Sequence, residues 1–351
     1  MTTTELLHLA SSEGASDIFI VAGLPLTLKT HEVFKTVSET KLSPADTETM
    51  IREIYKTAGN RELDKLFLDG DDDFSFSVVG LSRFRVNAYR QRGSYAAVIR
   101  VIAFYLPRPE DLHIPETIIR LADVSKGMVL LTGPAGCGKS TTLSCMVDHI
   151  NRTKAYHIIT LEDPLEFLHS HKKSIVSQRE INTDTQSYLG ALRAALRQNP
   201  NVILLGEMRD YETIHTAMTA AETGHLVLSS LHTIGASNTI DRIIDVFPSN
   251  QQQQIAVQLS MVLQAVVSQQ LVPAVNGGYV PAFEIMTLTP AIHNLIRSGK
   301  VHQIEGTLYS SATDQMISMD NSLLKLYHEG TISAETALHY ATNPEMLQKK
   351  L

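Results

Sequence analysis

The chain has 351 residues, a formal net charge of −7 and 43% hydrophobic residues. This length suggests two folded domains, and the acidic balance gives no overall basic footprint for nucleic acid as a main partner. No stretch approaches the roughly 20 consecutive apolar residues of a membrane span. Residues 1–17 lack a basic segment followed by an apolar core, so secretion is not expected. The two cysteines, Cys137 and Cys145, fit a reducing compartment without disulfides.

The first part of the chain predicts a small α+β domain over residues 1–104. Its segments 73–79, 83–88 and 96–103 alternate in the manner of antiparallel strands, and residues 42–68 show helical spacing. Helices packed against such strands form a mixed layer that can fold separately. We therefore expect an independent N-terminal domain.

A proline-rich linker is predicted over residues 105–115, because Pro107, Pro109 and Pro115 interrupt both helix and sheet pairing. An α/β core then follows over residues 116–288. Short apolar runs separated by amphipathic helices indicate a parallel sheet covered on both faces. The predicted strands are 128–132, 157–161, 202–205 and 226–230.

The last part of the chain predicts a helical C-terminal region over residues 289–351. After Pro281 the apolar pattern becomes mostly helical. We expect helices over residues 290–298, 320–329 and 333–341.

A phosphate-binding loop is predicted at GPAGCGKST, directly after an apolar strand and before a helix. Its glycines let the backbone wrap around phosphates, whose charge is stabilised by exposed amides and by the dipole of the following helix. Lys139 is expected to reach the β and γ phosphates, and Ser140 to ligate Mg²⁺. A purely structural glycine loop is the alternative. The predicted ATP-binding residues are Gly133, Pro134, Ala135, Gly136, Cys137, Gly138, Lys139, Ser140 and Thr141.

Cys137 allows two interpretations. At a helix N-terminus a thiolate is stabilised, which makes the thiol reactive. The alternative is a small residue that the loop tolerates.

Two strand ends carry acidic residues. Glu162 and Asp163 follow the apolar run 157–161, and strand ends are where α/β sheets hold ligands. We assign Glu162 to orient and deprotonate the attacking water, with Asp163 acting through Mg²⁺ or its water shell. Glu207, after run 202–205, is expected to assist Mg²⁺. The alternative for such acidic pairs is a helix cap or a solvated turn.

His225 and His232 flank the strand predicted at 226–230, from where imidazoles could sense the state of the nucleotide. Packing or surface histidines are the alternative. No third ligand of a zinc motif lies nearby, so the sequence supports no metal other than Mg²⁺.

Along nearly the whole chain these residues resemble the PilT-type retraction ATPases of the secretion and pilus ATPase superfamily. GPAGCGKST resembles the Walker A motif of that family and TLEDPLEF its aspartate box. GEMRD is similar to its Walker B variant, and TAAETGHLVLSSLHT to its histidine box. IDRIIDVFP and AIHNLIRSGK are further features of the retraction type.

The resemblance implies a RecA-like P-loop ATPase core with a smaller PAS-like N-terminal domain and a helical C-terminal extension. It implies a homohexamer with ATP near the subunit boundaries, located in the cytoplasm and peripheral to the inner membrane. The implied partners are a membrane-embedded pilus platform protein, the pilin fibre indirectly, and a paralogous ATPase as a further candidate.

In this family, arginines of the N-terminal domain approach the phosphates, and the matching strands here offer Arg85 and Arg100. Their guanidinium groups are candidates to stabilise transition-state oxygens. Solvated arginines are the alternative, and Arg83, Arg90 and Arg92 match less well.

Two residues depart from the family pattern: Cys137 stands where a small residue such as serine is common, and His293 where arginine is common. Extension motors of the superfamily usually carry a cysteine-rich zinc insertion. A chain with two cysteines cannot supply one, which favours retraction.

The resulting hypothesis is an ATP-hydrolysing motor of pilus retraction that acts through Lys139, Ser140, Glu162 and Glu207. One alternative is a related ring ATPase for secretion, pilus assembly or DNA uptake. Another is a regulatory subunit that binds ATP without hydrolysing it. A helicase is disfavoured by the acidic balance and the absence of tryptophan.

Overall fold

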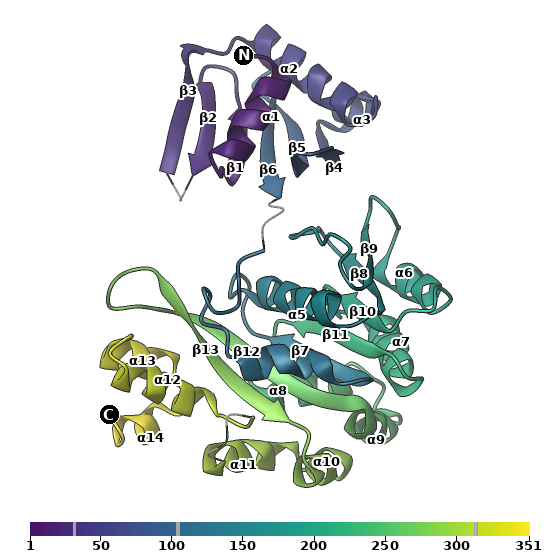
Figure 1. The fold of residues 1–351 in the computed structure, drawn as a ribbon, viewed down its shortest axis with the longest axis vertical. Coiled ribbons are helices and arrows are strands. Elements are labelled where there is room, and N and C mark those ends of the chain that lie inside the picture. The colour runs from purple at the N-terminus through teal and green to yellow at the C-terminus, as the bar shows by residue number, and fades with distance from the viewer. Residues whose placement is uncertain (31–32, 103–105, 312, 314) are drawn as a thin grey trace. The chain divides into compact units, whose positions relative to one another are not determined.

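The computed structural model describes residues 1–30, 33–102, 106–311, 313 and 315–351. The chain divides into two compact units, residues 1–105 with 166–168, and residues 106–165 with 169–351 (Figure 1). Three predicted features fall outside the described residues: Ala103 in the last strand of the first domain, the end of that domain at residue 104, and the start of the linker at residue 105.

The first unit contains a six-stranded antiparallel sheet with strand order β3-β2-β1-β6-β5-β4. The strands predicted at 73–79 and 83–88 and the helical spacing of 42–68 are confirmed, whereas β1 to β3 were not predicted. Its elements are α1 (Thr3–Ser12), β1 (Asp17–Ile20), β2 (Pro25–Thr30), β3 (Val33–Lys41), α2 (Pro44–Thr57), α3 (Asp64–Asp69), β4 (Asp71–Val78), β5 (Ser82–Gln91) and β6 (Ser94–Ile102).

Helices α1 and α2 pack on one face of this sheet. Alternate strand residues such as Phe84 and Ile99 point into a core that also contains Leu6 and Ile54. A capping box starts each helix; in α2 the hydroxyl of Ser43 accepts from the N–H of Asp46. The opposite face of the sheet carries the residues between these positions, among them the candidate arginines.

A buried ion pair ties α2 to the edge strand β4. The carboxylate of Asp72 accepts two hydrogen bonds of 3.0 Å from Arg61 and one of 2.9 Å from the hydroxyl of Tyr55. The side chain of Asp72 has no solvent exposure. Burial by itself raises the pKa of Asp72, but the bonds from Arg61 and Tyr55 outweigh it and hold that pKa below its usual value.

The second unit contains a seven-stranded sheet with order β13-β12-β7-β11-β10-β8-β9, parallel except for β13. The four predicted strands are confirmed within one residue at either end. The strands are β7 (Gly127–Thr132), β8 (His157–Glu162), β9 (Ile175–Glu180), β10 (Val202–Leu205), β11 (Leu226–Leu231), β12 (Leu263–Pro273) and β13 (Tyr279–Thr287).

Helices cover both faces of this sheet, as the continuous apolar strands require. One core contains α4 (Glu116–Arg120) and α5 (Lys139–Thr153), and the core on the other face contains the helices from α6 to α11. Those helices are α6 (Tyr188–Ala195), α7 (Tyr211–Glu222), α8 (Ala236–Asp245), α9 (Gln252–Val262), α10 (Pro290–Arg297) and α11 (Ile304–Ser310); the short 3₁₀ segments are Leu121–Asp123 and Val301–Gln303.

The prediction of a mostly helical pattern after Pro281 is wrong for residues 281–287, which belong to β13. This strand is apolar on both faces and pairs along its whole length with β12, so no alternation marks it. Helices begin at Pro290, and Ile292 and Ile296 of α10 are buried, as its amphipathic pattern predicts. The chain ends in α12 (Met319–His328), α13 (Ala334–Tyr340) and α14 (Pro344–Gln348), which share a separate small core.

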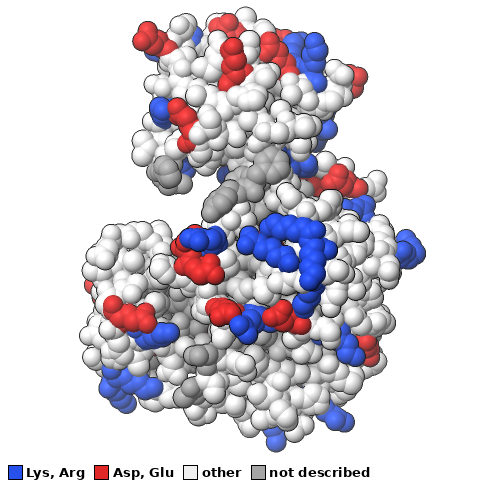
Figure 2. All heavy atoms as spheres, viewed as in Figure 1, with Lys and Arg blue, Asp and Glu red and all other residues white. Residues whose placement is uncertain are grey.

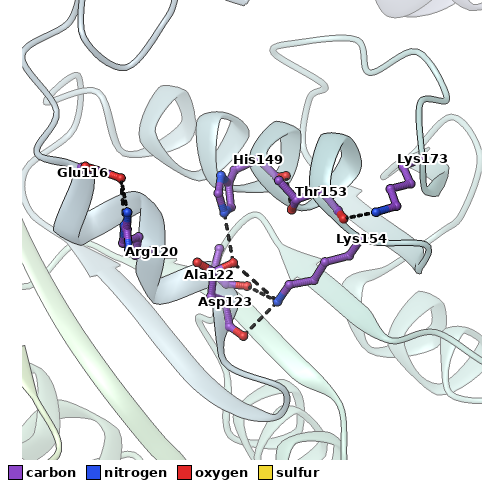
Figure 3. A network of polar contacts seen from close by, with 8 residues as sticks. All are labelled: Glu116, Arg120, Ala122, Asp123, His149, Thr153, Lys154 and Lys173. Carbon is purple, nitrogen blue, oxygen red and sulfur yellow. Dashed lines mark hydrogen bonds and ion pairs between the residues drawn. The ribbon is translucent and has the colours of Figure 1, made fainter.

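A polar network fixes the C-terminal end of α5 (Figure 3). The ammonium group of Lys154 donates to the carbonyl oxygens of Ala122 and Asp123, at 3.2 and 2.9 Å. The ring of His149 lies 3.0 Å from the carboxylate of Asp123, and Lys173 donates to the carbonyl of Thr153. The bond from Lys173 satisfies a carbonyl at the end of α5, and those from Lys154 tie this end of the helix to the 3₁₀ segment Leu121–Asp123.

Charges of opposite sign stand beside one another on the surface drawn in Figure 2. In the second unit Arg120 pairs with Glu116, and both Arg152 and Lys172 pair with Asp148. Over the described part of the chain, no helix combines the length and apolar character needed to cross a bilayer.

The substitution Asp72→Asn is expected to destabilise the first unit by about 2 kcal/mol at pH 7, because it removes charge-assisted bonds from a buried site. Since the folded state lowers the pKa of Asp72, its stabilisation is fully present above the ordinary aspartate value and is lost as pH falls through the lowered value. The difference between wild type and variant should therefore shrink below about pH 4. Calorimetry at a series of pH values measures this difference in the free energy of unfolding. Asp71→Asn, which changes an exposed neighbour, is the control. Equal losses in both variants would contradict a role for the pair.

Candidate nucleotide site

The predicted phosphate loop lies between β7 and α5, at the carboxyl edge of the parallel sheet. All of β7 is buried, and the loop turns into α5 at Gly138, the N-cap residue, which has a φ of +88°. The first N–H groups of α5 therefore face the loop, where an anion is stabilised by them and by the helix dipole. Pro134, Ala135 and Gly136 form the exposed tip, whereas Gly133 and Cys137 are buried.

Glycine is required at two points because the loop passes close to β12. A Cβ atom at Gly133, where φ is +138°, would lie 2.1 Å from the carbonyl oxygen of Gln269. One at Gly138 would lie 2.9 Å from the side-chain nitrogen of the same residue. Any side chain at either position would push the loop away from β12.

Lys139 is buried behind the loop. Its ammonium group donates to the carbonyl oxygens of Gly133 and Pro134, both at 2.8 Å. Both acceptors are neutral, and among the described residues no carboxylate forms an ion pair with Lys139. The loop thus presents a concentrated positive field that suits polyphosphate. Ser140 and Thr141 follow on the first turn of α5, both half-buried.

Gln269 is a site residue that the sequence did not reveal. Its side chain is almost fully buried, donates to the carbonyl oxygen of Cys137 at 2.6 Å and accepts from the hydroxyl of Thr142 at 2.9 Å. It therefore clamps the end of the loop and the start of α5 onto β12. The residue is 132 positions from Cys137, and no spacing rule links the two.

The phenol of Tyr188 lies in the electric field of three carboxylates. Glu162 ends β8 and is buried, and Asp163 after it is exposed. Burial raises the pKa of Tyr188, and the negative charges of Glu207, Asp163 and Glu162 raise it further. The phenol therefore keeps its proton and can donate to a carboxylate. Tyr188 is the second residue that sequence reasoning missed, because one tyrosine at the start of a helix belongs to no motif.

Glu207 lies beyond the end of β10 and contacts Arg209 and His232. Its carboxylate lies 2.7 Å from the guanidinium of Arg209 and 3.5 Å from the ring nitrogen Nε2 of His232. A pocket of about 430 Å³ opens here, which these side chains line together with Arg242. The structure thus brings Glu162, Asp163, Glu207 and His232 to the same edge as the phosphate loop.

His225 lies apart from this group in the structure. It precedes β11, at the amino edge of the parallel sheet, and its ring nitrogen Nδ1 lies 2.9 Å from the carbonyl oxygen of Ala220 in α7. His232 follows β11 at the carboxyl edge. A six-residue strand separates the two, which is about 20 Å of extended chain.

Arg85 and Arg100 are cross-strand partners on β5 and β6, on the face of the first sheet that α1 and α2 leave open. The guanidinium of Arg100 lies 3.2 Å from the carboxylate of Asp17, its partner on β1. Like charges directly opposite one another are destabilising. The pair therefore favours an anion on this face of the first unit.

The residues present fit a Mg²⁺ ion that is bound together with phosphates. Among the described residues, no three His, Cys, Asp or Glu side chains are grouped to hold a metal by themselves. Mg²⁺ is typically held by one or two protein oxygens, substrate phosphates and water. The hydroxyl of Ser140 and the carboxylates of Glu207 and Asp163 are oxygen donors of that kind.

Both cysteine side chains are buried, which favours the packing interpretation of Cys137. Burial raises the pKa of Cys137, although the nearby ammonium of Lys139 opposes this shift. Burial, with the charges of Asp148 and Glu110, raises the pKa of Cys145 to about 12. Neither thiol is expected to ionise at neutral pH.

A lysine buried behind a glycine loop, with carboxylates on the neighbouring strand ends, is the arrangement of P-loop nucleoside triphosphatases. The RecA-like α/β core and the separate N-terminal sheet are those that the sequence predicts.

The chain belongs to the type II/IV secretion system protein family, whose model matches residues 4–341. It is 44% identical to the type IV pilus retraction ATPase PilT of Pseudomonas aeruginosa, over 98% of this chain and 99% of that protein. It is 40% identical to a twitching motility protein of Neisseria gonorrhoeae, over 97% of this chain and 91% of that protein. The crystal structure of the pilus retraction motor PilT with bound ADP matches with a TM-score of 0.91 at 44% identity, covering 99% of both chains. The predicted resemblance to PilT-type ATPases is confirmed.

The substitution Gln269→Leu is expected to weaken ADP binding about tenfold, because it leaves the carbonyl of Cys137 and the hydroxyl of Thr142 without a partner. Isothermal titration with ADP measures the affinity. Gln270→Leu changes the adjacent residue, which points to the other face of β12, and serves as the control. Wild-type affinity in Gln269→Leu would show that the loop keeps its shape without the clamp.

Both thiols are expected to react with a disulfide reagent at pH 7.5 at least tenfold more slowly than a free cysteine peptide, since both are buried with raised pKa values. The rate should rise as pH increases and become fast in denaturant. Absorbance of the released thiolate follows the reaction. Fast labelling that disappears in Cys137→Ser would restore the reactive interpretation of that residue.

Proposed function

We propose that this chain hydrolyses ATP with Mg²⁺ and, as a homohexamer at the cytoplasmic face of the inner membrane, drives retraction of type IV pili. The observation that carries the proposal is the convergence of Glu162 and Glu207 at the edge where the glycine loop holds Lys139. Near-complete coverage of a retraction ATPase at 44% identity supports the biological role.

Binding begins with the polyphosphate at the loop from Gly133 to Gly138. Here the N–H groups at the start of α5 donate to phosphate oxygens, and Lys139 exchanges its two carbonyl partners for the β and γ phosphates. Ser140, Asp163 and Glu207 would hold Mg²⁺, which neutralises charge on the β and γ phosphates.

For hydrolysis, Glu162 orients the attacking water and accepts its proton. Its burial at the end of a central strand fixes the carboxylate against a rigid sheet. Tyr188 keeps its proton and donates toward the carboxylates, which limits repulsion among three like charges. His232 contacts Glu207 and is placed to register changes at that carboxylate.

The arginines act from the N-terminal domain. Arg85 and Arg100 are proposed to stabilise charge on transferring phosphoryl oxygens, because they face each other across β5 and β6 and the ion pair of Arg100 with Asp17 offsets one of the two positive charges. In this proposal residues 1–104 form the domain that supplies them, residues 105–115 form the linker, residues 116–288 hydrolyse ATP and residues 289–351 extend the core. The proposed partners are a platform protein of the inner membrane, the pilin fibre indirectly and a paralogous ATPase.

The substitution Glu162→Gln is expected to lower the kcat for phosphate release at least 100-fold, because it removes the base while preserving size. Nucleotide affinity and hexamer formation should stay within about twofold of wild type, since an uncharged amide adds no steric conflict. Mg²⁺-dependent phosphate release, ADP titration and sedimentation measure the three properties. Glu222→Gln, at the exposed end of α7, is the control.

Equal hydrolysis by wild type and Glu162→Gln would reject Glu162 as the base. ATP binding without hydrolysis by wild type in the presence of its partners would favour the regulatory subunit. In cells, Glu162→Gln should leave pili assembled but unable to retract. Loss of pili would instead favour a motor of pilus assembly.

A further inference from the structure

Glu284 is a buried acidic residue in the middle of β13 that the proposed reaction does not use. Its side chain is 7% exposed, and its cross-strand partner on β12 is Ser268. Burial raises the pKa of Glu284, while hydrogen bonds from two backbone N–H groups oppose that shift. A buried carboxyl group is costly unless its oxygens are used.

Each oxygen of Glu284 holds the start of a different helix. Oε1 accepts from the N–H of Ala236, the first residue of α8, at 2.7 Å. Oε2 accepts from the N–H of Met319, the first residue of α12, at 3.4 Å. The N-cap residue of α8 is Gly235, which has no side chain to cap the helix, so Glu284 supplies the missing acceptor from the sheet.

Ser268 holds the same end of α8 from the neighbouring strand. Its hydroxyl oxygen accepts from the N–H of Gly235 at 3.0 Å. The next residue of β12, Gln269, points to the opposite face and clamps the phosphate loop. Two adjacent residues of one strand therefore hold the phosphate loop and the start of α8.

The start of α8 is tied to the loop that carries His232. The hydroxyl oxygens of Thr233 in that loop and Thr239 in α8 lie 2.7 Å apart, and the hydroxyl of Thr239 also donates to the carbonyl oxygen of Gly235 at 2.7 Å. His232 in turn lies 3.5 Å from the carboxylate of Glu207. A shift of the first turn of α8 would therefore move His232 relative to Glu207.

On its other side, Glu284 faces a cavity of about 230 Å³ next to α12. The cavity is also lined by Glu305, Tyr309 and Asp320. Asp320 is a second buried carboxylate, but its oxygens accept from the N–H groups of Thr342 and Asn343, in the turn between α13 and α14. The start of α12 is also held to β13 by the backbone hydrogen bonds between Ile285 and Ile317. Glu284 differs from these contacts because its two oxygens bond to the starts of both α8 and α12.

We propose that Glu284 is a positioning residue that joins the C-terminal helices to the His232 loop, and so holds His232 against Glu207 during ATP hydrolysis. The inference rests on the proposed ATPase function for its effect on rate. Its structural part, the anchoring of α8 from β13, stands on the hydrogen bonds alone.

The experiment compares full-length wild type with Glu284→Gln and with Asp320→Asn. The first variant presents an NH₂ group to one of the two N–H groups and so breaks one bond. The second also removes a buried charge from the same cavity but has no bond to α8. Phosphate release gives kcat and KM, and ADP titration gives the affinity for ADP. Hydrogen exchange measures how fast the backbone amides of residues 232–240 exchange with solvent.

In Glu284→Gln we expect kcat to fall about tenfold, with ADP affinity within twofold of wild type and faster exchange over residues 232–240. Asp320→Asn should lower the melting temperature about as much as Glu284→Gln does, while its kcat and its exchange over residues 232–240 stay at wild-type values. Ser268→Ala removes the hydrogen bond from the N–H of Gly235 and should also lower kcat.

Unchanged exchange over residues 232–240 in Glu284→Gln would overturn the proposal, as would a kcat loss no larger than that in Asp320→Asn. If wild type itself fails to hydrolyse ATP, the proposed function fails. Exchange in the two variants then still decides whether Glu284 anchors α8.

Discussion

The close approach of the phosphate loop to β12 is the constraint on which the rest of the site depends. Gly133 and Gly138 lie where Gln269 occupies the adjacent space, and the Gln269 amide bonds to the end of the loop at Cys137 and to the start of α5 at Thr142. The position of Lys139 follows from this turn, and the start of α5 is fixed by it. The loop keeps its shape through contacts with a strand and through the positive φ angles that its glycines adopt.

The same strand, β12, contacts both the phosphate loop and the start of α8. Its residues alternate between the α5 face and the α8 face, so neighbouring positions act on different parts of the site. Gln269 holds the loop that binds phosphate, and Ser268 holds the helix behind His232. On β13, Glu284 also holds the start of α8, and in addition it holds the start of α12. The phosphate loop, the start of α8 and the start of α12 are therefore all held by one pair of strands.

The parts of this arrangement that are local in sequence could be predicted. The loop motif gave the position of Lys139 because strand, glycines and helix are contiguous, and Glu162 and Glu207 could be placed because each directly follows an apolar run. Gln269, Tyr188 and Glu284 could not, since their roles come from contacts with residues far away in the chain. The separation of His225 from His232 could not be predicted either, because a pattern that flanks a strand does not say which end of the strand lies at the phosphate loop. β13 was missed because burial on both faces removes the alternation that marks a strand.

The clamp by Gln269 also has a consequence for how the protein is made. Cys137 and Gln269 are 132 residues apart, and a ribosome needs roughly ten seconds to synthesise that length. During this interval the loop has emerged without the strand that shapes it. Nucleotide cannot then guide early folding of the core, and a chain that stops before residue 269 will carry the complete phosphate-loop motif without a fixed place to bind it. Competence to bind ATP therefore arrives late in synthesis, together with the closing strands of the sheet.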